Sequence, residues 1–380
     1  MPFHLQAFTS SHLLASSSSH AASSSPSRRL RLRMSTGMEP PKVLCYGEAL
    51  VDRLGPLGGD PATDLPVDDR LGGAPANVAC GLAKLGTSVA FLGRLGEDEI
   101  GRQFLEVFKN RHINIDALQW DPVRPSRVVL VERDSSGDRE FGGFLGDRSG
   151  EGYADQAVDP LALLRALPRF LPAAQWLLIG TLPLASALSA DALQAAVSWA
   201  EGAGVKVALD INWRPTFWEG HSHPSEGPSP AALAAIRPLL SKASLVKFAK
   251  EEAEWLFDAE TRPHVISEAL PQKPAVLVTD GGGKLAWKVG GHTGEMDAFD
   301  VQAIDTTGAG DAFVAGLLHQ LVNEPRLLEG GKEGGIEEVV RFACACGAMV
   351  CQGPGAIDPQ ATLTEVHSFM AGKGKKSISL

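Results

Sequence analysis

The sequence predicts an α/β fold in which helices cover both faces of a mostly parallel central sheet. Short apolar runs alternate with amphipathic stretches of helical period, and this alternation continues over most of the chain. The expected strands are Val43–Val51, Ser88–Leu92, Val128–Glu132, Trp176–Ile179, Lys206–Ile211, Leu245–Phe248 and Ala275–Val278. The expected helices are Ala76–Leu85, Ile100–Lys109, Leu161–Ala166, Ala190–Ala200 and Ala312–Leu321.

The composition is that of a chain that can bury a large core. Of its 380 residues 44% are hydrophobic and 21% are charged, and 41 Gly and 25 Pro supply many turns. The net charge of −10 argues against nucleic acid as a partner. No run of 18 apolar residues exists, so we expect no membrane span. The five cysteines show no spacing typical of a zinc site.

The first 38 residues differ from the rest. They contain eleven Ser and four Arg between Arg28 and Arg33, and the first acidic residue is Glu39. This composition is typical of an organelle transit peptide, and its many serines favour a plastid over a mitochondrion. We therefore expect a disordered transit peptide over 1–38 and a mature protein in the chloroplast stroma. The alternative is a disordered N-terminus without a targeting role.

The most informative stretch is Asp305-Thr306-Thr307-Gly308-Ala309-Gly310-Asp311, which precedes a helical pattern. Gly308 and Gly310 permit a tight turn whose amides, at a helix N-terminus, favour an anion. Asp311 in the first helical turn is suited to accept a proton from a hydroxyl that attacks a phosphoryl group. The alternative is that Asp311 only complements the helix dipole. Neither a dinucleotide fingerprint nor a Walker P-loop fits this sequence.

Two upstream stretches complete the pattern. Leu71-Gly72-Gly73-Ala74-Pro75-Ala76-Asn77 forms a rigid turn, after which Asn77 opens an Ala-rich helix. The alternative role for Asn77 is a helix cap. Val43–Val51 leads to Asp52 at the carboxyl end of a buried strand, which faces the ligand crevice in open α/β sheets. The alternative for Asp52 is an ordinary solvated carboxylate.

These three stretches, in this order, resemble the PfkB-type carbohydrate kinases of the ribokinase-like superfamily, and within it the fructokinase-like branch. The resemblance runs from about Lys42 to about Pro359. It implies a ribokinase-like fold, with the kinase domain over 42–365 and a C-terminal tail over 366–380. It also implies a small β lid built from segments near 53–70 and 123–150, whose closure excludes water from the sugar. A homodimer through the lid is a further expectation.

The resemblance assigns a role to each matching position. Asp311 matches the catalytic base, and Gly308, Ala309 and Gly310 match the anion hole for the transferring phosphate. Positions that match sugar contacts are Asp52, Gly72, Gly73 and Asn77. Positions that match the ATP site are Asn212, Arg214, Lys247, Thr279 and Gly281. Glu252 matches the residue that organises Mg²⁺ through water, and Asp305 lies where many relatives bind a monovalent cation such as K⁺.

Structural roles are open for some of these residues. Asp210 and Arg214 could form a structural ion pair, and Glu251 and Glu252 could be a solvated helix start. The sequence also departs from the family pattern. Lys250, Lys284 and Cys344 replace an Asp or Asn, a Gly and an Asn. The segment from Arg139 to Arg148 differs from the usual fructokinase lid, which leaves the identity of the sugar open.

We therefore expect ATP-dependent phosphorylation of a sugar hydroxyl, with Mg²⁺ and K⁺ as cations and a small-molecule sugar and ATP as partners. Fructose is the first candidate over its 6-phosphate, because the only cations near Asn77 are Arg53, Arg70 and Lys84. The alternatives are a kinase for another sugar, a nucleoside or an inositol, and a non-catalytic regulatory protein of plastids. The intact Asp311 loop favours the enzyme.

Overall fold

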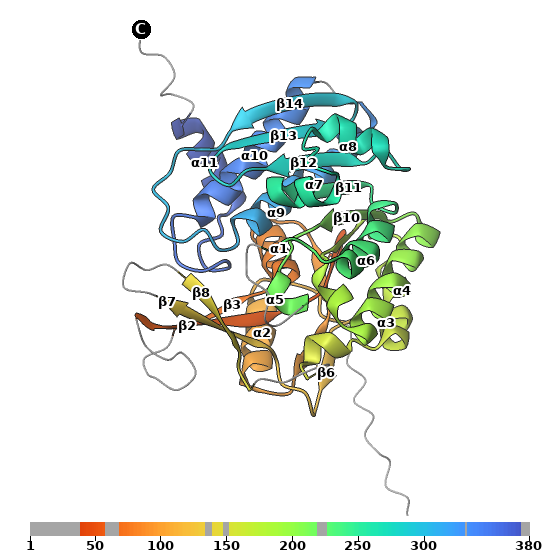
Figure 1. The fold of residues 1–380 in the computed structure, drawn as a ribbon, viewed down its shortest axis with the longest axis vertical. Helices are drawn as coiled ribbons and strands as arrows, with labels where there is room; N and C mark the ends of the chain where they lie inside the picture. The colour runs from red at the N-terminus through yellow and green to blue at the C-terminus, as the bar shows by residue number, and fades with distance from the viewer. Residues whose placement is uncertain are drawn as a thin grey trace, which may run out of the picture. The chain divides into compact units, whose positions relative to one another are not determined.

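The computed structural model describes residues 39–57, 68–133, 139–146, 152–218, 226–330 and 333–373. Eight strands form one large sheet in the order β14-β13-β12-β11-β10-β9-β1-β4. Figure 1 labels the strands from β14 to β10. Six strands are parallel: β1 Val43–Tyr46, β4 Val89–Leu92, β9 Trp176–Ile179, β10 Lys206–Asp210, β11 Leu245–Ala249 and β12 Ala275–Thr279. Two antiparallel strands complete one edge, β13 Lys284–Val289 and β14 His292–Asp297. The expected α/β fold is confirmed, whereas the N-terminal segment 1–38 lies outside the described residues.

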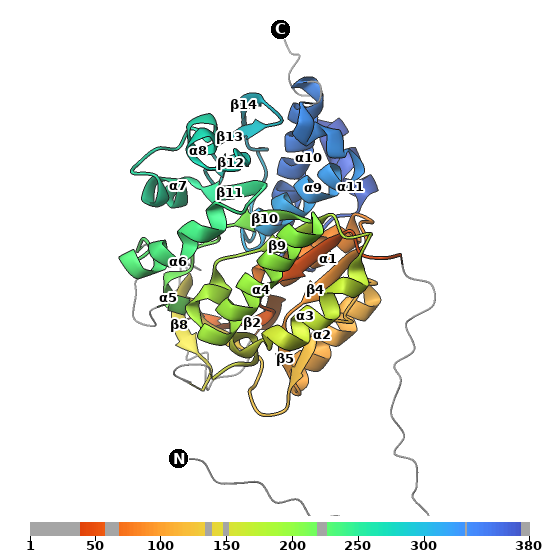
Figure 2. The same ribbon diagram turned by 90° about the vertical axis from the view of Figure 1, so that its right-hand side faces the viewer.

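Helices cover both faces of this sheet. One face carries α1 Ala74–Lys84, α2 Glu99–Asn110, α9 Ala309–Asn323 and α10 Glu333–Val350. The other carries α3 Pro160–Ala166, α4 Ala187–Ala203, α6 Pro230–Leu240, α7 Lys250–Leu256 and α8 Pro263–Ala269 (Figure 2). Along β1, Val43 and Cys45 pack into the first core, and Leu44 and Tyr46 pack into the second. Buried residues on both faces explain why the strand reads as a continuous apolar run.

Local signals in the sequence account for the helix ends. Pro75 stands in the first turn of α1, where its missing N–H is not needed. The Asp98 side chain caps α2 by accepting from the Gly101 amide at 2.8 Å. Ser229 caps α6 in the same way, and Gly204 ends α4 in the left-handed conformation. Short helical turns are α5 Pro215–Trp218, η1 Ala154–Ala157, η2 Leu167–Phe170, η3 Leu182–Ala185 and η4 Pro325–Glu329.

A second, four-stranded sheet forms the small β lid that was expected. Its order is β3-β2-β7-β8, with β2 Leu50–Leu57, β3 Asp68–Gly72, β7 Val128–Arg133 and β8 Arg139–Phe144. The β2–β7 pair is parallel and the two outer pairs are antiparallel. Val51, Val128 and Leu130 form a small core of its own.

The expected single strand over Val43–Val51 is wrong. The chain leaves the large sheet after Tyr46, and β2 begins at Leu50 in the lid. Gly47 makes the last contact with the large sheet, donating from its amide to the Leu92 carbonyl. Two buried strands in succession have the same apolar pattern as one longer strand, so the sequence did not separate them. Asp52 therefore belongs to the lid.

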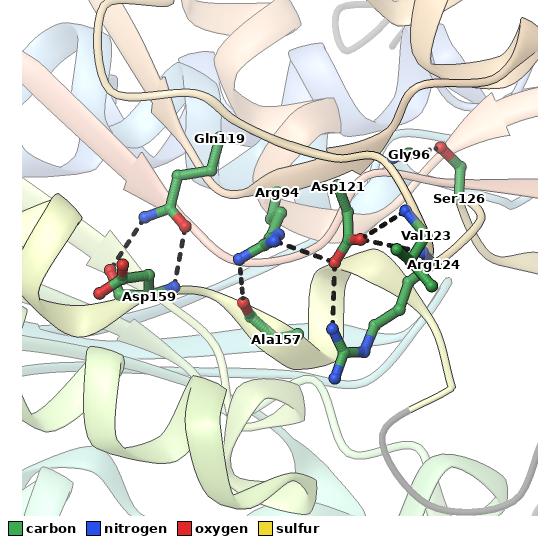
Figure 3. Close-up of polar contacts among 9 residues, drawn as sticks. All are labelled: Arg94, Gly96, Gln119, Asp121, Val123, Arg124, Ser126, Ala157 and Asp159. Atoms are coloured by element: carbon green, nitrogen blue, oxygen red, sulfur yellow. Dashed lines mark hydrogen bonds and ion pairs between the residues drawn. The ribbon is translucent and has the colours of Figure 1, made fainter.

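A polar network fixes the segment that leads into β7. Strands β5 Arg94–Gly96 and β6 Gln119–Asp121 pair in parallel. The buried Asp121 carboxylate accepts from the Val123 and Arg124 amides, both at 2.9 Å, and pairs with Arg94 at 3.1 Å (Figure 3). Because the lid strand β7 begins a few residues later, this network anchors the root of the lid to the body.

The folded body extends beyond the expected boundary at residue 365. Helix α11 covers Leu363–Lys373, and its Val366 and Met370 are buried against Phe342 and Val350. The Thr362 hydroxyl donates to Glu365 at 2.7 Å at the start of this helix. Among the residues that the structure describes, no helix combines the length and apolar character needed to cross a membrane.

Candidate active site

A cleft of about 680 Å³ lies where the parallel strands end and the lid begins. The segments after β10, β11 and β12 contribute Asn212, Glu251 and Gly281, and the lid contributes Val129 and Phe141. This is the ligand position expected for an open α/β sheet. The predicted site residues that line the cleft are Asp52, Gly73, Asn77, Asn212, Arg214, Lys247, Glu252, Thr279, Gly281, Gly308, Gly310 and Asp311. The remaining three, Gly72, Ala309 and Asp305, do not line it.

Asp311 and Asn77 meet in this cleft. Asp311 stands in the first turn of α9, and its Oδ2 accepts a hydrogen bond from Asn77 Nδ2 at 2.8 Å. Both side chains are buried. Helix α1 begins at Ala74 with Gly73 as its cap, so the interpretation of Asn77 as a helix cap is wrong. Asn77 Oδ1 is buried and has no hydrogen-bond partner among the described residues, which leaves an acceptor for a ligand hydroxyl.

The charges around Asp311 adjust its proton affinity. Burial raises the pKa of the Asp311 carboxyl, and the Asp52 carboxylate adds to this effect. The Asn77 hydrogen bond and the positive charges of Arg214 and Lys247 oppose it, but the net pKa stays above the ordinary value. A raised pKa makes a carboxylate a stronger acceptor of a proton from an alcohol.

The glycine turn before α9 has the conformation that the sequence predicts. Gly308 caps the helix with a φ of 77°, and a Cβ there would overlap Ala356. The Ala309 amide donates to the Thr306 carbonyl at 3.2 Å, inside the turn. Gly308 and Gly310 are therefore the members of the expected anion hole that reach the cleft.

A buried cation lies beside this turn. A Cβ at Gly310 would come within 3.4 Å of Lys247 Nζ, and Nζ pairs with Asp210 Oδ1 at 3.1 Å. Burial alone would lower the pKa of Lys247, but the carboxylates of Asp210, Glu252 and Asp311 outweigh it and raise the pKa. Lys247 therefore carries its charge next to the helix N-terminus. The sequence left open an ion pair of Asp210 with Arg214, but in the structure Asp210 pairs with Lys247.

Glu252 holds two loops of the cleft together. Its two carboxylate oxygens accept from the backbone amides of Trp213 and Ala249, each at 2.7 Å. The side chain is buried, so a solvated helix start describes its neighbour Glu251 and not Glu252. Burial raises the pKa of Glu252, with Lys247 acting in the opposite direction.

Two of the predicted site residues that do not line the cleft, Asp305 and Gly72, contact residues that do. Asp305 Oδ1 accepts from the Thr307 amide at 2.9 Å and its Oδ2 from the Gly355 amide at 2.8 Å. This buried carboxylate thus ties the glycine turn to the loop after α10. Gly72 lies against the lid carboxylate, since a Cβ there would come within 3.3 Å of Asp52 Oδ2.

Comparison with known proteins identifies the family. The profile described as "pfkB family carbohydrate kinase" matches residues 40–363. This chain belongs to the pfkB family of carbohydrate kinases. It is an enzyme that transfers a phosphoryl group to an alcohol group of its acceptor.

Relatives and solved structures agree with this family. The chain is 32% identical over 336 residues, 87% of this chain and 83% of the relative, to "Probable fructokinase-6, chloroplastic" of Arabidopsis thaliana. A fructokinase from Xylella fastidiosa with bound ATP has 28% identity and a TM-score of 0.73, covering 88% of this chain and 99% of that chain. A fructokinase from Vibrio cholerae O395, bound to fructose, ADP and calcium, has 27% identity and a TM-score of 0.69, covering 87% and 99%.

The three residues that depart from the family pattern, Lys250, Lys284 and Cys344, each contact another side chain. Lys250 Nζ lies 3.2 Å from Asp280 Oδ2, which joins the segments after β11 and β12. Lys284 Nζ pairs with Glu295 across the β13–β14 hairpin at 2.7 Å, and the Cys344 thiol contacts Met296. None of these three residues lines the cleft.

Sequence reasoning missed one acidic residue of the cleft. Glu48 lies in the short connection between β1 and β2, is buried, and lines the cleft. Its Oε1 accepts from the Ala74 amide at 3.1 Å. Burial raises the pKa of Glu48 to about 7. The signal that could have identified it is an acidic residue two positions after a buried parallel strand.

Proposed function

We propose that this kinase transfers the γ-phosphoryl group of ATP to a hydroxyl of a neutral sugar, with fructose as the first candidate. The single observation that carries the proposal is the Asn77–Asp311 hydrogen bond beside the Gly308–Gly310 turn in one cleft. A base and an anion site so placed suit a hydroxyl that attacks a phosphoryl group. The fructokinase relatives support the choice of sugar.

Asp311 acts as the general base in this proposal. It takes the proton of the attacking hydroxyl, while Asn77 restrains its carboxylate and offers Oδ1 to the sugar. The lid residue Asp52 and the turn residue Gly73 form the sugar end of the cleft, and Gly72 lies behind Asp52. Closing the lid over that end excludes water, which otherwise competes as the phosphoryl acceptor.

The opposite side of Asp311 receives the phosphates. The amides of Gly308 and Gly310 and the buried Lys247 would stabilise negative charge on the transferring group. Asn212, Arg214, Thr279 and Gly281 line the nucleotide end, at the ends of β10 and β12. Positioning and electrostatics supply most of the rate in such a reaction.

For Glu252 we propose a role toward a magnesium ion that the ATP phosphates hold. The described residues contain no group of three or more His, Cys, Asp or Glu side chains able to hold a metal ion. Mg²⁺ commonly binds to phosphates with one or two carboxylates and several waters, and Glu252 would hold such a water. When bound, Mg²⁺ neutralises charge on the phosphates.

For Asp305 we propose a role near a monovalent cation such as K⁺. Its carboxylate is buried behind the glycine turn and accepts two backbone amides. A double mutant of the Vibrio cholerae fructokinase was solved with fructose, ADP and potassium. The test is whether K⁺ raises the rate of the wild-type protein and not that of Asp305→Asn.

The sugar end of the cleft favours a neutral acceptor. Its charged side chains Glu48, Asp52 and Asp311 are all acidic. Two of the three cations expected near Asn77 pair with other carboxylates: Arg53 pairs with Asp69, and Arg70 pairs with Asp68. A sugar phosphate would meet no complementary charge here, so fructose is preferred over fructose 6-phosphate.

The decisive experiment is a panel of sugars, sugar phosphates, nucleosides and inositols with ATP and Mg²⁺, scored for ADP release. Fructose should give the highest kcat/KM. A clear preference for a sugar phosphate or a nucleoside would reject the proposed substrate.

Residence in the chloroplast stroma and a homodimer through the lid are also proposed. The chloroplastic relative supports the location, and light scattering of the purified protein measures the oligomeric state.

A further inference from the structure

Glu48 has one engaged and one unengaged carboxyl oxygen. Oε1 accepts from the Ala74 amide, at the first residue of the helix that carries Asn77. Oε2 is buried and has no hydrogen-bond partner among the described residues. The whole residue is 5% exposed. A buried polar atom without a partner is destabilising and therefore calls for a functional explanation.

Glu48 lies between the main cleft and a smaller cavity. Glu48 lines the main cleft together with Asp52, Asn77 and Asp311. It also lines a small cavity of about 10 Å³ that it shares with Arg127 and Asp155. Glu48 thus stands where the cleft meets the junction of the large sheet and the lid.

Arg127, which lines the same small cavity as Glu48, is already paired with another carboxylate. Arg127 Nη2 pairs with Asp155 Oδ2 at 2.9 Å, and both of these side chains are buried. The Arg127 guanidinium also lies 4.9 Å from the centre of the Phe217 ring. Burial raises the pKa of Glu48, the Asp155 and Asp311 carboxylates raise it further, and the Ala74 amide lowers it. Near neutral pH the carboxyl can therefore both donate and accept a hydrogen bond.

We propose that Glu48 is a further sugar-binding residue, whose Oε2 bonds to an acceptor hydroxyl other than the one that Asp311 deprotonates. This inference rests on the proposed sugar kinase activity and extends it to one specific contact. Asp311 is already restrained by Asn77, whereas Glu48 is held by the Ala74 amide, in the same first turn of α1. A substrate with a carboxylate or phosphate at this place would face Glu48 and Asp52, and would be rejected.

The test compares Glu48→Ala and Glu48→Gln with the wild-type protein. Glu48→Ala should raise the sugar KM about 5- to 150-fold, the effect of losing one buried hydrogen-bond partner, with the ATP KM changed less than about 2-fold. Glu48→Gln keeps an oxygen for Ala74 and a polar group for the sugar, so its loss should be smaller. Asp159→Asn, an isosteric loss of charge at the cap of α3 outside the cleft, should leave both constants unchanged.

Deoxy sugars identify the hydroxyl. For one monodeoxy analogue of the preferred sugar, the wild-type protein and Glu48→Ala should show the same KM, because the contact is absent in both. Thermal unfolding measures whether each Glu48 variant is folded. If Glu48→Ala is unfolded, the test uses Glu48→Gln alone.

The outcomes separate the two proposals. An unchanged sugar KM in the folded variants, equal loss for sugar and ATP, or a loss that no deoxy analogue removes would each overturn the role of Glu48 alone. If the wild-type protein phosphorylated no neutral sugar, the proposed function and this inference would both fall.

Discussion

The Asn77 side-chain amide donates to the Asp311 carboxylate at 2.8 Å, although the two residues are 234 positions apart. This bond joins the start of α1 to the start of α9 inside the cleft. It restrains the Asp311 carboxylate, the proposed base, and lowers the pKa of that carboxyl against the effect of burial. In the proposed mechanism, the sugar side and the phosphate side of the site meet at this pair.

Asp311→Asn should abolish turnover and spare ATP binding. The amide is nearly isosteric and its oxygen can still accept from Asn77, but it cannot take a proton. Loss of a general base lowers the rate by about 10²–10⁴-fold. We would measure kcat with saturating sugar and the dissociation constant for ATP by calorimetry. Full activity in the purified variant would refute the role of Asp311.

Asn77→Ala should raise the sugar KM strongly and change the ATP KM little. The loss of a buried partner is worth roughly 1–3 kcal/mol. Because the Asn77 bond lowers the pKa of Asp311, its removal should also move the acidic limb of the kcat/KM profile to higher pH. Equal weakening for sugar and ATP, or an unshifted limb, would contradict the assignment.

Glu48→Gln should stabilise the sugar-free protein at alkaline pH. The folded-state pKa of Glu48 is raised to about 7. A raised carboxyl pKa destabilises the fold progressively as pH increases from about 4.5 to about 7, and the penalty is constant above that. The variant should therefore match the wild-type Tm at pH 4 and exceed it at pH 8, by at most roughly 3 kcal/mol in unfolding free energy. A difference that does not depend on pH would show that Glu48 titrates normally.

Glu252→Gln should destabilise the protein by roughly 1–3 kcal/mol, because both carboxylate oxygens accept backbone amides and one would become a donor. Glu251→Gln is the matched control, since Glu251 is exposed and directly precedes Glu252 in the chain. Denaturant unfolding should place the control at the wild-type midpoint and Glu252→Gln below it. Equal midpoints for all three proteins would remove Glu252 as the tie between the two loops.

Residues 1–40 fused to a fluorescent reporter should direct it to plastids in leaf cells. The motive is the Ser-rich and Arg-bearing composition without acidic residues before Glu39. The same reporter fused to residues 39–380 should stay in the cytosol. A diffuse cytosolic signal from the first fusion would remove the basis for the proposed location.

The sequence by itself determined the fold class and the local form of the glycine turn before α9. Alternating strand and helix patterns depend on near neighbours along the chain, and so does the left-handed turn at Gly308 before α9. The place of Asp311 in the first helical turn follows from the same local geometry. The family resemblance then supplied roles for residues whose own surroundings the sequence does not show.

Only the tertiary structure decided which side chains meet. It split Val43–Val51 between two sheets, placed Asn77 on Asp311, and paired Asp210 with Lys247 rather than with Arg214. It also showed that one oxygen of Glu48 is buried without a partner among the described residues. Contacts of this kind depend on the order of strands in the sheet and on burial. Both arise from the packing of segments far apart in the chain, which no local pattern encodes.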